Sequence, residues 1–260
     1  MNFNFLYSII NTIRYEERCT LCHIPFIQTN HSTKVQQSKI NSSLTKKKKL
    51  CLQCSDLLKP QIKGYCPSCG ELSKDKQSPI TSCHSCLKNP PSWEHFYFLN
   101  AYEGEYKKLL IQSKFKGNPS ITQLLGILLA ECCLKLPTPD AIIPMPLHPS
   151  RLRKRGFNQC QELAKPVAYA LKRPLRHDLL LRVIPTSHQT GLSQTQRLLN
   201  IKNAFQANPS VKGLRILLID DIMTTGTTLQ QATKALLKQH AQAIDICIVA
   251  RTPSLSLKKV

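Results

Sequence analysis

Eight of the twelve cysteines form four C-x-x-C pairs, all in the first third of the 260-residue chain. A C-x-x-C turn directs two thiolates at one metal ion, and two such turns complete the tetrahedral shell that zinc prefers. Sequential pairing therefore predicts two structural zinc sites, each of which would stabilise a segment too small to fold by itself. The ligands of the first site are Cys19, Cys22, Cys51 and Cys54, and those of the second are Cys66, Cys69, Cys83 and Cys86.

Other cysteine chemistries match parts of this pattern. Four cysteines also ligate iron–sulfur clusters. A disulfide framework requires an oxidising compartment, and redox C-x-x-C motifs usually occur singly. Cys19, Cys22 and His23 match the haem-attachment signature, but that attachment requires export. Zinc is the preferred interpretation, because disulfides and haem attachment would require export and the sequence shows no targeting signal for it.

Two adjacent carboxylates followed by a hydroxyl-rich loop form the second group that could do chemistry. Asp220 and Asp221 follow an apolar tetrad, residues 216–219, which is typical of a buried strand. A loop of four threonines and one glycine then leads into a helix. The members of this threonine loop are Thr224, Thr225, Gly226, Thr227 and Thr228.

The threonine loop has the properties of a phosphate site. A helix N-terminus provides unpaired N–H groups and a partial positive charge, and Gly226 permits close approach of the backbone. Asp220 and Asp221 would accept hydrogen bonds from vicinal hydroxyls. Phosphate beside a diol describes a ribose 5-phosphate. The simpler interpretation, that Asp221 or a threonine only caps the helix, explains one polar residue and not the whole set.

Short apolar strands alternate with helices in the rest of the chain. Strands are expected at residues 96–102, 141–144, 216–219 and 244–250, and helices at 106–111, 121–134, 159–171 and 228–238. This alternation predicts an α/β fold whose parallel sheet is covered by helices on both faces. Ligands of such sheets bind at the carboxyl ends of the strands, which is where the two aspartates fall.

The charge balance indicates polyanionic partners. The chain carries 36 Lys and Arg against 15 Asp and Glu, a formal net charge of +21. Nucleic acid, phosphorylated metabolites or an anionic membrane surface would fit this charge. Between residues 151 and 182, nine basic side chains stand against two acidic ones. A second basic run is either a solvated loop or an arm that contacts phosphates without sequence selectivity. This run consists of Lys46, Lys47, Lys48 and Lys49.

Composition also limits the class of protein. A hydrophobic content of 42% excludes wholesale disorder, although the polar loop at residues 28–50 is expected to be flexible. No run reaches the roughly 18 apolar residues of a membrane span. Residues 1–13 are interpreted as an amphipathic helix rather than a signal peptide, since they lack a basic start and a small-residue cleavage site. We therefore expect a cytoplasmic protein with reduced thiols.

Several segments resemble known families. The sequence ILLIDDIMTTGTT at residues 216–228 resembles the motif that binds 5-phosphoribosyl 1-diphosphate (PRPP) in type I phosphoribosyltransferases. Residues 143–159 and 189–200 resemble the ComF/GntX family of competence-associated proteins (ComF and ComFC), as does the N-terminal double zinc ribbon. The resemblance covers essentially the whole chain. It implies a zinc-binding module in residues 1–92 and a type I phosphoribosyltransferase-like α/β domain in residues 93–260.

The resemblance also implies roles for individual residues. Asp220 and Asp221 would hold the ribose hydroxyls and the threonine loop the 5-phosphate, while Mg²⁺ would bridge the ligand oxygens. The loop on the diphosphate side would consist of Pro146, Leu147 and His148, followed by Arg151 and Arg155 as bidentate partners of phosphate.

A polar segment at residues 186–200 resembles a flap over the site. Arg197 within it would join Asp220 and Asp221 as a catalytic residue, or else would lie on the surface of a helix. Catalysis would displace pyrophosphate at the anomeric carbon of the ribose. We find no recognisable pocket for an acceptor base and no obvious general base.

Two functions follow from the resemblance and the charge. The first is handling of imported single-stranded DNA in the cytoplasm during natural transformation, together with other competence or DNA-processing proteins. Its nucleic-acid contacts would be Arg151, Arg153, Lys154 and Arg155, with the lysine run at residues 46–49 as an auxiliary arm. The alternative is an active phosphoribosyltransferase of nucleotide salvage.

Overall fold

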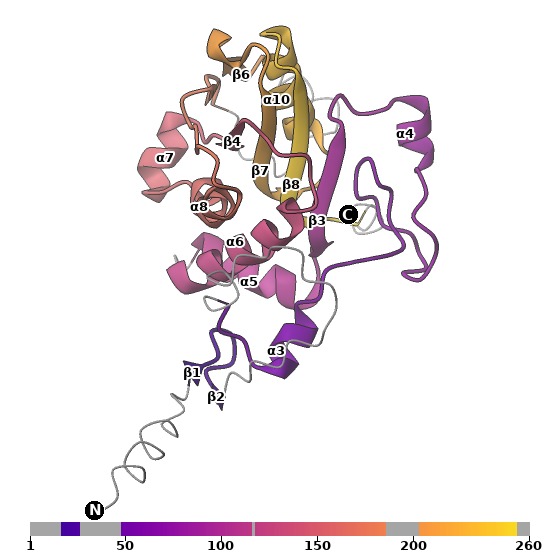
Figure 1. The fold of residues 1–260 in the computed structure, drawn as a ribbon, viewed down its shortest axis with the longest axis vertical. Helices are drawn as coiled ribbons and strands as arrows, with labels where there is room; N and C mark the ends of the chain where they lie inside the picture. The colour runs from indigo at the N-terminus through magenta and orange to yellow at the C-terminus, as the bar shows by residue number, and fades with distance from the viewer. Residues whose placement is uncertain (1–16, 27–47, 116–117, 186–202, 254–260) are drawn as a thin grey trace, which may run out of the picture. The chain divides into compact units, whose positions relative to one another are not determined.

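The computed structural model describes residues 17–26, 48–115, 118–185 and 203–253 (Figure 1). The chain divides into two compact units, Met1–Leu58 and Lys59–Val260. The boundary expected after residue 92 lies inside the second unit. The second cysteine tetrad therefore belongs to the same compact unit as the sheet.

In the described residues of the first unit, 17–26 and 48–58, one cysteine tetrad lies on two short strands and one short helix. β1 (Glu17–Arg18) pairs antiparallel with β2 (Pro25–Phe26), and the turn between them contains one C-x-x-C pair. The second pair lies at the start of α3 (Leu52–Leu57). So small a segment buries little apolar surface, which agrees with a fold that depends on a bound metal.

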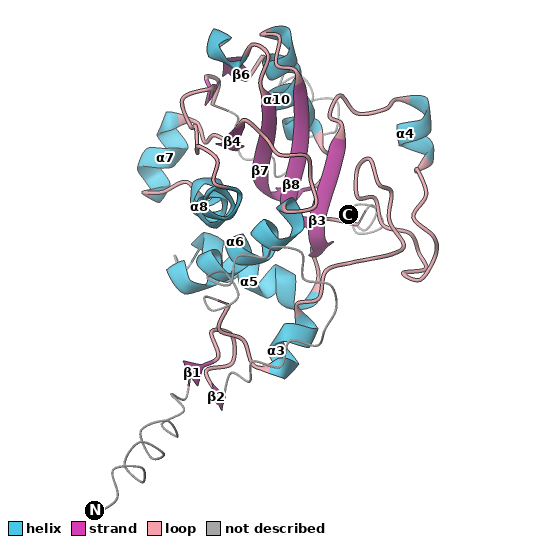
Figure 2. Ribbon diagram, in the orientation of Figure 1, coloured by secondary structure: helices cyan, strands magenta, loops and turns pink. Residues whose placement is uncertain are grey.

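The second unit is built on a four-stranded parallel sheet in the order β3–β8–β7–β4 (Figure 2). The strands are β3 (His95–Ala101), β4 (Ala141–Pro144), β7 (Arg215–Met223) and β8 (Ala243–Arg251). Every residue of β8 is buried, as expected of a central strand in a parallel sheet. The α/β fold with a parallel sheet that the sequence predicts is confirmed.

Helices cover both faces of this sheet. α10 (Thr227–Lys238) shares one apolar core with alternate residues of β7 and β8, including Ile216, Leu218 and Ile246. α6 (Pro119–Cys133) and α8 (Gln159–Leu171) pack against each other on the opposite face (Figure 2). α5 (Gly104–Phe115) packs beside α6.

Asparagine side chains set the starts of two of these helices. Asn118 accepts hydrogen bonds from the amides of Ser120 and Ile121 at the start of α6, and Asn158 accepts one from Cys160 at the start of α8. Such caps satisfy amides that have no partner within the helix. The cap of α8 fixes the position of Cys160, which matters for the site.

Shorter elements complete the second unit. They are α4 (His84–Lys88), α7 (Pro149–Arg155), the 3₁₀ helix η1 (Pro209–Val211) and the antiparallel pair β5 (Leu180–Arg182) and β6 (Phe205–Ala207). No helix within the described ranges combines the length and the apolar character needed to cross a bilayer.

The central strand β7 is longer than its apolar tetrad. β8 continues to pair with it as far as Ile222 and Met223. Asp220 and Asp221 therefore lie within the strand and not in the loop after it. The sequence pattern stops at residue 219 because carboxylates interrupt the apolar run, whereas the backbone pairing does not depend on the side chains.

Candidate functional site

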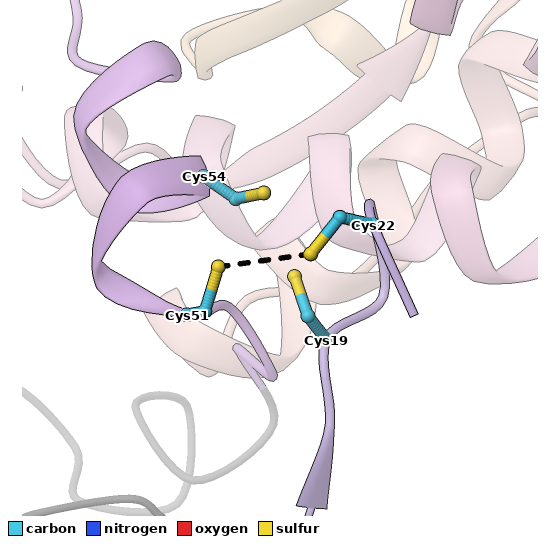
Figure 3. Close-up of side chains that lie close together, drawn as sticks. All are labelled: Cys19, Cys22, Cys51 and Cys54. Carbon is cyan, nitrogen blue, oxygen red and sulfur yellow. Dashed lines mark hydrogen bonds between the residues drawn. The ribbon is translucent and has the colours of Figure 1, made fainter. Parts of the chain in front are cut away.

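The first cysteine tetrad has the geometry of a single-metal site. The sulfur atoms of Cys19, Cys22, Cys51 and Cys54 lie within 4.8 Å of one another and converge in Figure 3. The Sγ atoms of Cys22 and Cys51 are 3.7 Å apart. Zinc–sulfur bonds of about 2.3 Å in a tetrahedron place two sulfurs about 3.8 Å apart. The spacing therefore fits one ion and is too long for a disulfide.

The backbone of this tetrad favours a thiolate. Burial raises the pKa of Cys19, but hydrogen bonds from the backbone of Cys22 and Cys51 outweigh it and lower the pKa to about 6. Burial and the neighbouring sulfurs raise the pKa of Cys54. Four thiols this close cannot all ionise without a cation among them, which supports a divalent ion as the occupant.

The second tetrad is similar in geometry and is part of the sheet unit. Cys66, Cys69, Cys83 and Cys86 lie within the same 4.8 Å limit, and the Sγ atoms of Cys69 and Cys83 are 3.7 Å apart. Its knuckle, residues 66–72, packs on β3. A Cβ atom on Gly70 would lie 2.6 Å from the ring of Phe96, and the indole Nε1 of Trp93 donates to the carbonyl of Ser68 at 2.6 Å.

The acid pair lies at the end of the central strand. Asp220 is 8% exposed, and its Oδ1 accepts hydrogen bonds from the amide of Asp221 at 2.8 Å and from the thiol of Cys160 at 3.2 Å. Oδ2 of Asp221 is 3.6 Å from Nζ of Lys114, and the carboxylate oxygens of both aspartates lie within 4.8 Å of each other and of the sulfur of Cys160. The site thus holds two carboxylates beside one cation.

Burial, followed by the charge of Asp221, raises the pKa of Asp220 to about 7. Burial and the charges of both aspartates raise the pKa of Cys160 as well. Cys160 is therefore a protonated donor to Asp220 in the metal-free protein. The two aspartates present carboxylate oxygens, which are the ligands that Mg²⁺ prefers, so the donor set fits that ion.

The threonine loop leads from β7 into α10. Gly226 is the N-cap residue of α10, with φ +78°, and no side chain caps the helix. Asp221 therefore does not occupy the cap position, while Oγ1 of Thr225 accepts a long hydrogen bond of 3.5 Å from the amide of Thr227 at the start of the helix. The positive φ favours glycine at this position, and a Cβ there would also require the flexible side chain of Met223, whose Cε would lie 2.5 Å away, to move. Thr224 and Thr225 are exposed, and the hydroxyls of Thr225 and Thr227 are 2.9 Å apart.

The diphosphate-side loop follows β4 as expected, but His148 has a structural task. Its Nδ1 accepts a hydrogen bond from the amide of Ser150 and so caps α7. Pro146 and Leu147 lie between β4 and this cap and are partly exposed. Asn158 fixes the loop by donating to the carbonyl of Met145 at 3.0 Å.

The basic side chains near this loop fall into three groups according to their surroundings. Nη2 of Arg155 donates to the carbonyl of Lys114 at 2.8 Å, so its guanidinium holds the residue that faces Asp221. Arg153 and Lys154 are exposed on α7. Arg182 is 8% exposed, and burial and the positive charge of Arg151 lower its pKa, while the charge of Asp220 opposes them. Arg151 and Arg182 therefore belong to the electrostatic surroundings of Asp220.

Three residues of this site were not predicted from the sequence: Lys114, Cys160 and, as part of the phosphate site, Arg182. They come from α5, α8 and β5, and no local motif marks them. Arg197, Lys46 and Lys47 lie outside the described residues. Lys49 is described, and its Nζ is 3.8 Å from Oε1 of Glu17.

Comparisons with known proteins identify the domain that contains this site. Residues 158–260, which include the acid pair and the threonine loop, match the phosphoribosyl transferase domain family. The chain is 31% identical over 209 residues to the DNA utilization protein YhgH of Salmonella typhi, a match that covers 78% of this chain and 90% of that protein. It is 34% identical over 211 residues to competence protein F of Haemophilus influenzae, with 78% and 90% covered.

Among solved structures, the glutamine phosphoribosylpyrophosphate amidotransferase from B. subtilis aligns with a TM-score of 0.38 and 18% identity, over 54% of this chain and 30% of that chain. The parallel sheet, the acid pair and the family match together define a type I phosphoribosyltransferase-like domain. With its level of identity over most of its length, the chain belongs to the ComF/GntX family of competence-associated proteins.

The cysteine geometry predicts the metal content. We expect about two zinc ions per chain, because each tetrad has the sulfur spacing of one tetrahedral site. Inductively coupled plasma mass spectrometry of the purified protein measures this directly. Cys19→Ser/Cys22→Ser and Cys83→Ser/Cys86→Ser should each lose one ion. A content well below two, or iron in place of zinc, would contradict the assignment.

The buried carboxyl of Asp220 predicts a pH-dependent gain of stability on its removal. Its folded pKa near 7 exceeds the ordinary value near 3.9, so its ionisation destabilises the folded protein progressively as the pH rises from about 4 to about 7. Asp220→Asn should therefore raise the free energy of unfolding by about 2–4 kcal/mol at pH 8, and by roughly 2 kcal/mol less at pH 5.5.

Urea denaturation without PRPP measures both values. Asp178→Asn is the matched control. The pKa of Asp178 is lowered to about 2 by its hydrogen bond from Arg176, so this exposed variant should gain no stability. An Asp220→Asn protein no more stable than the wild type at pH 8 would show that the carboxyl is not strained there.

Proposed function

We propose that this protein binds PRPP with Mg²⁺ and binds single-stranded DNA in the cytoplasm during natural transformation. The observation that carries the PRPP part is the acid pair of Asp220 and Asp221 at the end of β7, continuous with a glycine-capped threonine loop. Asp220 and Asp221 accept hydrogen bonds from the ribose hydroxyls. The amides and hydroxyls of the threonine loop surround the 5-phosphate.

The remaining residues of the site balance the charges of the acid pair and of the diphosphate. Lys114 compensates the charge of Asp221 in the free protein. Arg182 interacts electrostatically with Asp220 and with Arg151, and the two arginines attract the diphosphate. Mg²⁺ supplies charge neutralisation on the diphosphate when it is bound. Arg155 acts through Lys114, whose carbonyl it holds, and Arg197 is the proposed residue of the flap.

The DNA part of the proposal is supported by the printed names of the relatives and by the exposed charge on α7. Relatives are named as a competence protein and as DNA utilization proteins. Lys165 and Arg176 already pair with Glu162 and Asp178, so they attract DNA weakly. Arg153 and Lys154 remain as the exposed cations beside the diphosphate side of the site. The reduced thiols of both tetrads support a cytoplasmic protein.

An active phosphoribosyltransferase of nucleotide salvage is the second candidate. The acid pair and the arginines that would stabilise a pyrophosphate leaving group favour it. The chemistry would break the bond between the anomeric carbon and the diphosphate oxygen and form a bond from that carbon to the acceptor. Release of pyrophosphate on addition of a nucleobase distinguishes this function from PRPP binding alone.

The double variant Asp220→Asn/Asp221→Asn should lose PRPP binding, because neutral amides cannot replace carboxylates as acceptors for two hydroxyls and Mg²⁺. Isothermal titration calorimetry with Mg²⁺ measures the dissociation constant. Asp178→Asn, an exposed carboxylate outside the site, is the control and should bind as the wild type does. A wild-type protein that shows no heat of binding would refute the PRPP site.

Arg153→Ala/Lys154→Ala should weaken binding of single-stranded DNA. Each phosphate contact contributes about 0.7 to the slope of log affinity against log salt, so the double variant should reduce that slope by roughly 1 to 1.4. Fluorescence anisotropy of a labelled oligonucleotide, titrated at several salt concentrations with and without PRPP, gives the slope.

Lys234→Ala/Lys238→Ala, two exposed lysines of α10, removes the same charge from a helix on the other face of the sheet. It should leave the slope nearly unchanged. An equal decrease of the salt slope in both double variants would show that DNA binding depends only on the net charge of the protein. No binding by the wild type at low salt would exclude the DNA role.

A further inference from the structure

One buried cation of the second unit has no part in ligand binding as described above. Arg251 is the last residue of β8 and is 5% exposed. A buried guanidinium is costly unless its N–H groups are hydrogen-bonded. The partners of Arg251 therefore identify the segments that this residue holds together.

One side of the guanidinium contacts the knuckle of the second cysteine tetrad. Nε donates to the carbonyl oxygen of Cys69 at 3.0 Å, and Nη2 donates to Oε2 of Glu71 at 2.7 Å. The knuckle is closed by backbone bonds of 2.8 Å from Gly70 to Cys66 and from Cys66 to Glu71. Because Cys69 is also an expected metal ligand, a bound ion would fix the carbonyl that Arg251 uses.

The other side of the guanidinium contacts the start of the threonine loop. Nη1 donates to the carbonyl oxygens of Met223 at 3.2 Å, of Thr252 at 2.6 Å and of Thr224. A peptide group is planar and trans, so its N–H points away from its carbonyl. The bonds to Met223 and Thr224 therefore also set the directions of the next two amides, those of Thr224 and Thr225.

We propose that Arg251 is a positioning residue that couples metal binding in the second tetrad to phosphate binding by the threonine loop. This inference rests on the proposed PRPP site. With the metal bound, the knuckle holds Arg251, and Arg251 holds the loop in the conformation that receives phosphate. Without the metal, Cys69 and Glu71 lose their fixed positions, and the ligand must order the loop at a cost in affinity.

The coupling can be tested first without PRPP. Hydrogen exchange is measured by mass spectrometry on peptides that cover residues 223–228, in the wild type, in Arg251→Met and in Glu71→Gln. Both variants should exchange faster than the wild type in these peptides while the zinc content is unchanged. Arg176→Met, which removes an exposed arginine that pairs with Asp178, should exchange as the wild type does. Unchanged exchange in Arg251→Met would overturn the proposal.

The second test measures PRPP affinity in a double-mutant cycle. Cys83→Ser/Cys86→Ser removes the second metal, and we expect the dissociation constant for PRPP with Mg²⁺ to rise about tenfold. Arg251→Met should have a similar effect alone. The two changes combined should cost little more than either one, because both break the same connection. Arg251→Lys keeps the charge but not the planar fork and should recover only part of the affinity.

Glu71→Gln keeps all four cysteines and serves if the cysteine variant does not fold. It should weaken PRPP binding in the wild type and have no effect in the Arg251→Met background. Fully additive losses would overturn the coupling. If the wild type binds no PRPP, the proposed function fails, while the hydrogen-exchange result still decides whether Arg251 links the knuckle to the loop.

Discussion

The unequal pairing of β7 is the constraint on which the site depends. β4 pairs with it only as far as Ile219, whereas β8 pairs with it as far as Met223. Beyond Ile219, one edge of the central strand is therefore free of a neighbouring strand. The acid pair lies in this interval, and the carboxylate oxygens of Asp220 and Asp221 lie within 4.8 Å of each other there. One carboxylate meets Cys160 and the other meets Lys114.

This arrangement favours binding over stability. Two adjacent carboxylates with little exposure repel each other and are poorly solvated, and the raised pKa of Asp220 is the result. The amide of Asp221, the thiol of Cys160 and the ammonium group of Lys114 offset part of this cost. A ligand with two hydroxyls and an associated cation would satisfy the acceptors that the protein leaves incompletely paired. Such strained polar groups are expected at functional sites and rarely elsewhere.

Local patterns in the sequence did not predict the short strands β1, β2, β5 and β6, but they were sufficient for the four strands of the parallel sheet, the threonine loop and the two cysteine tetrads. Each of these depends on neighbouring residues: an apolar run, a glycine with positive φ, or a fixed spacing of thiols. Lys114, Cys160 and Arg182 could not be predicted in this way, because tertiary packing brings them to the acid pair from α5, α8 and β5. Arg155 was assigned to diphosphate because of its type and place in the family motif, and its bond to the carbonyl of Lys114 depends on the same packing.

The position of the second tetrad was also beyond the reach of spacing alone. Four C-x-x-C pairs indicate two ions, but they do not say on which unit each ion lies. The aromatic residues that follow the last C-x-x-C pair indicate that the second tetrad belongs to the same unit as the sheet. Trp93, Phe96 and Phe98 have large apolar surfaces, and all three contact the knuckle of the second tetrad or the adjacent Tyr65. A domain boundary placed after residue 92 would separate the second tetrad from the aromatic residues that it contacts.

The edge-to-face contact between Tyr65 and Phe98, with ring centroids 5.2 Å apart, has a consequence for how this protein can change over evolutionary time. A domain that is exchanged between genes must carry its whole core with it. Because residues 59–92 share an apolar core with β3, the segment that can be inherited as a module begins near residue 59. The second tetrad must therefore be inherited together with the sheet, whereas the first tetrad lies in the other compact unit.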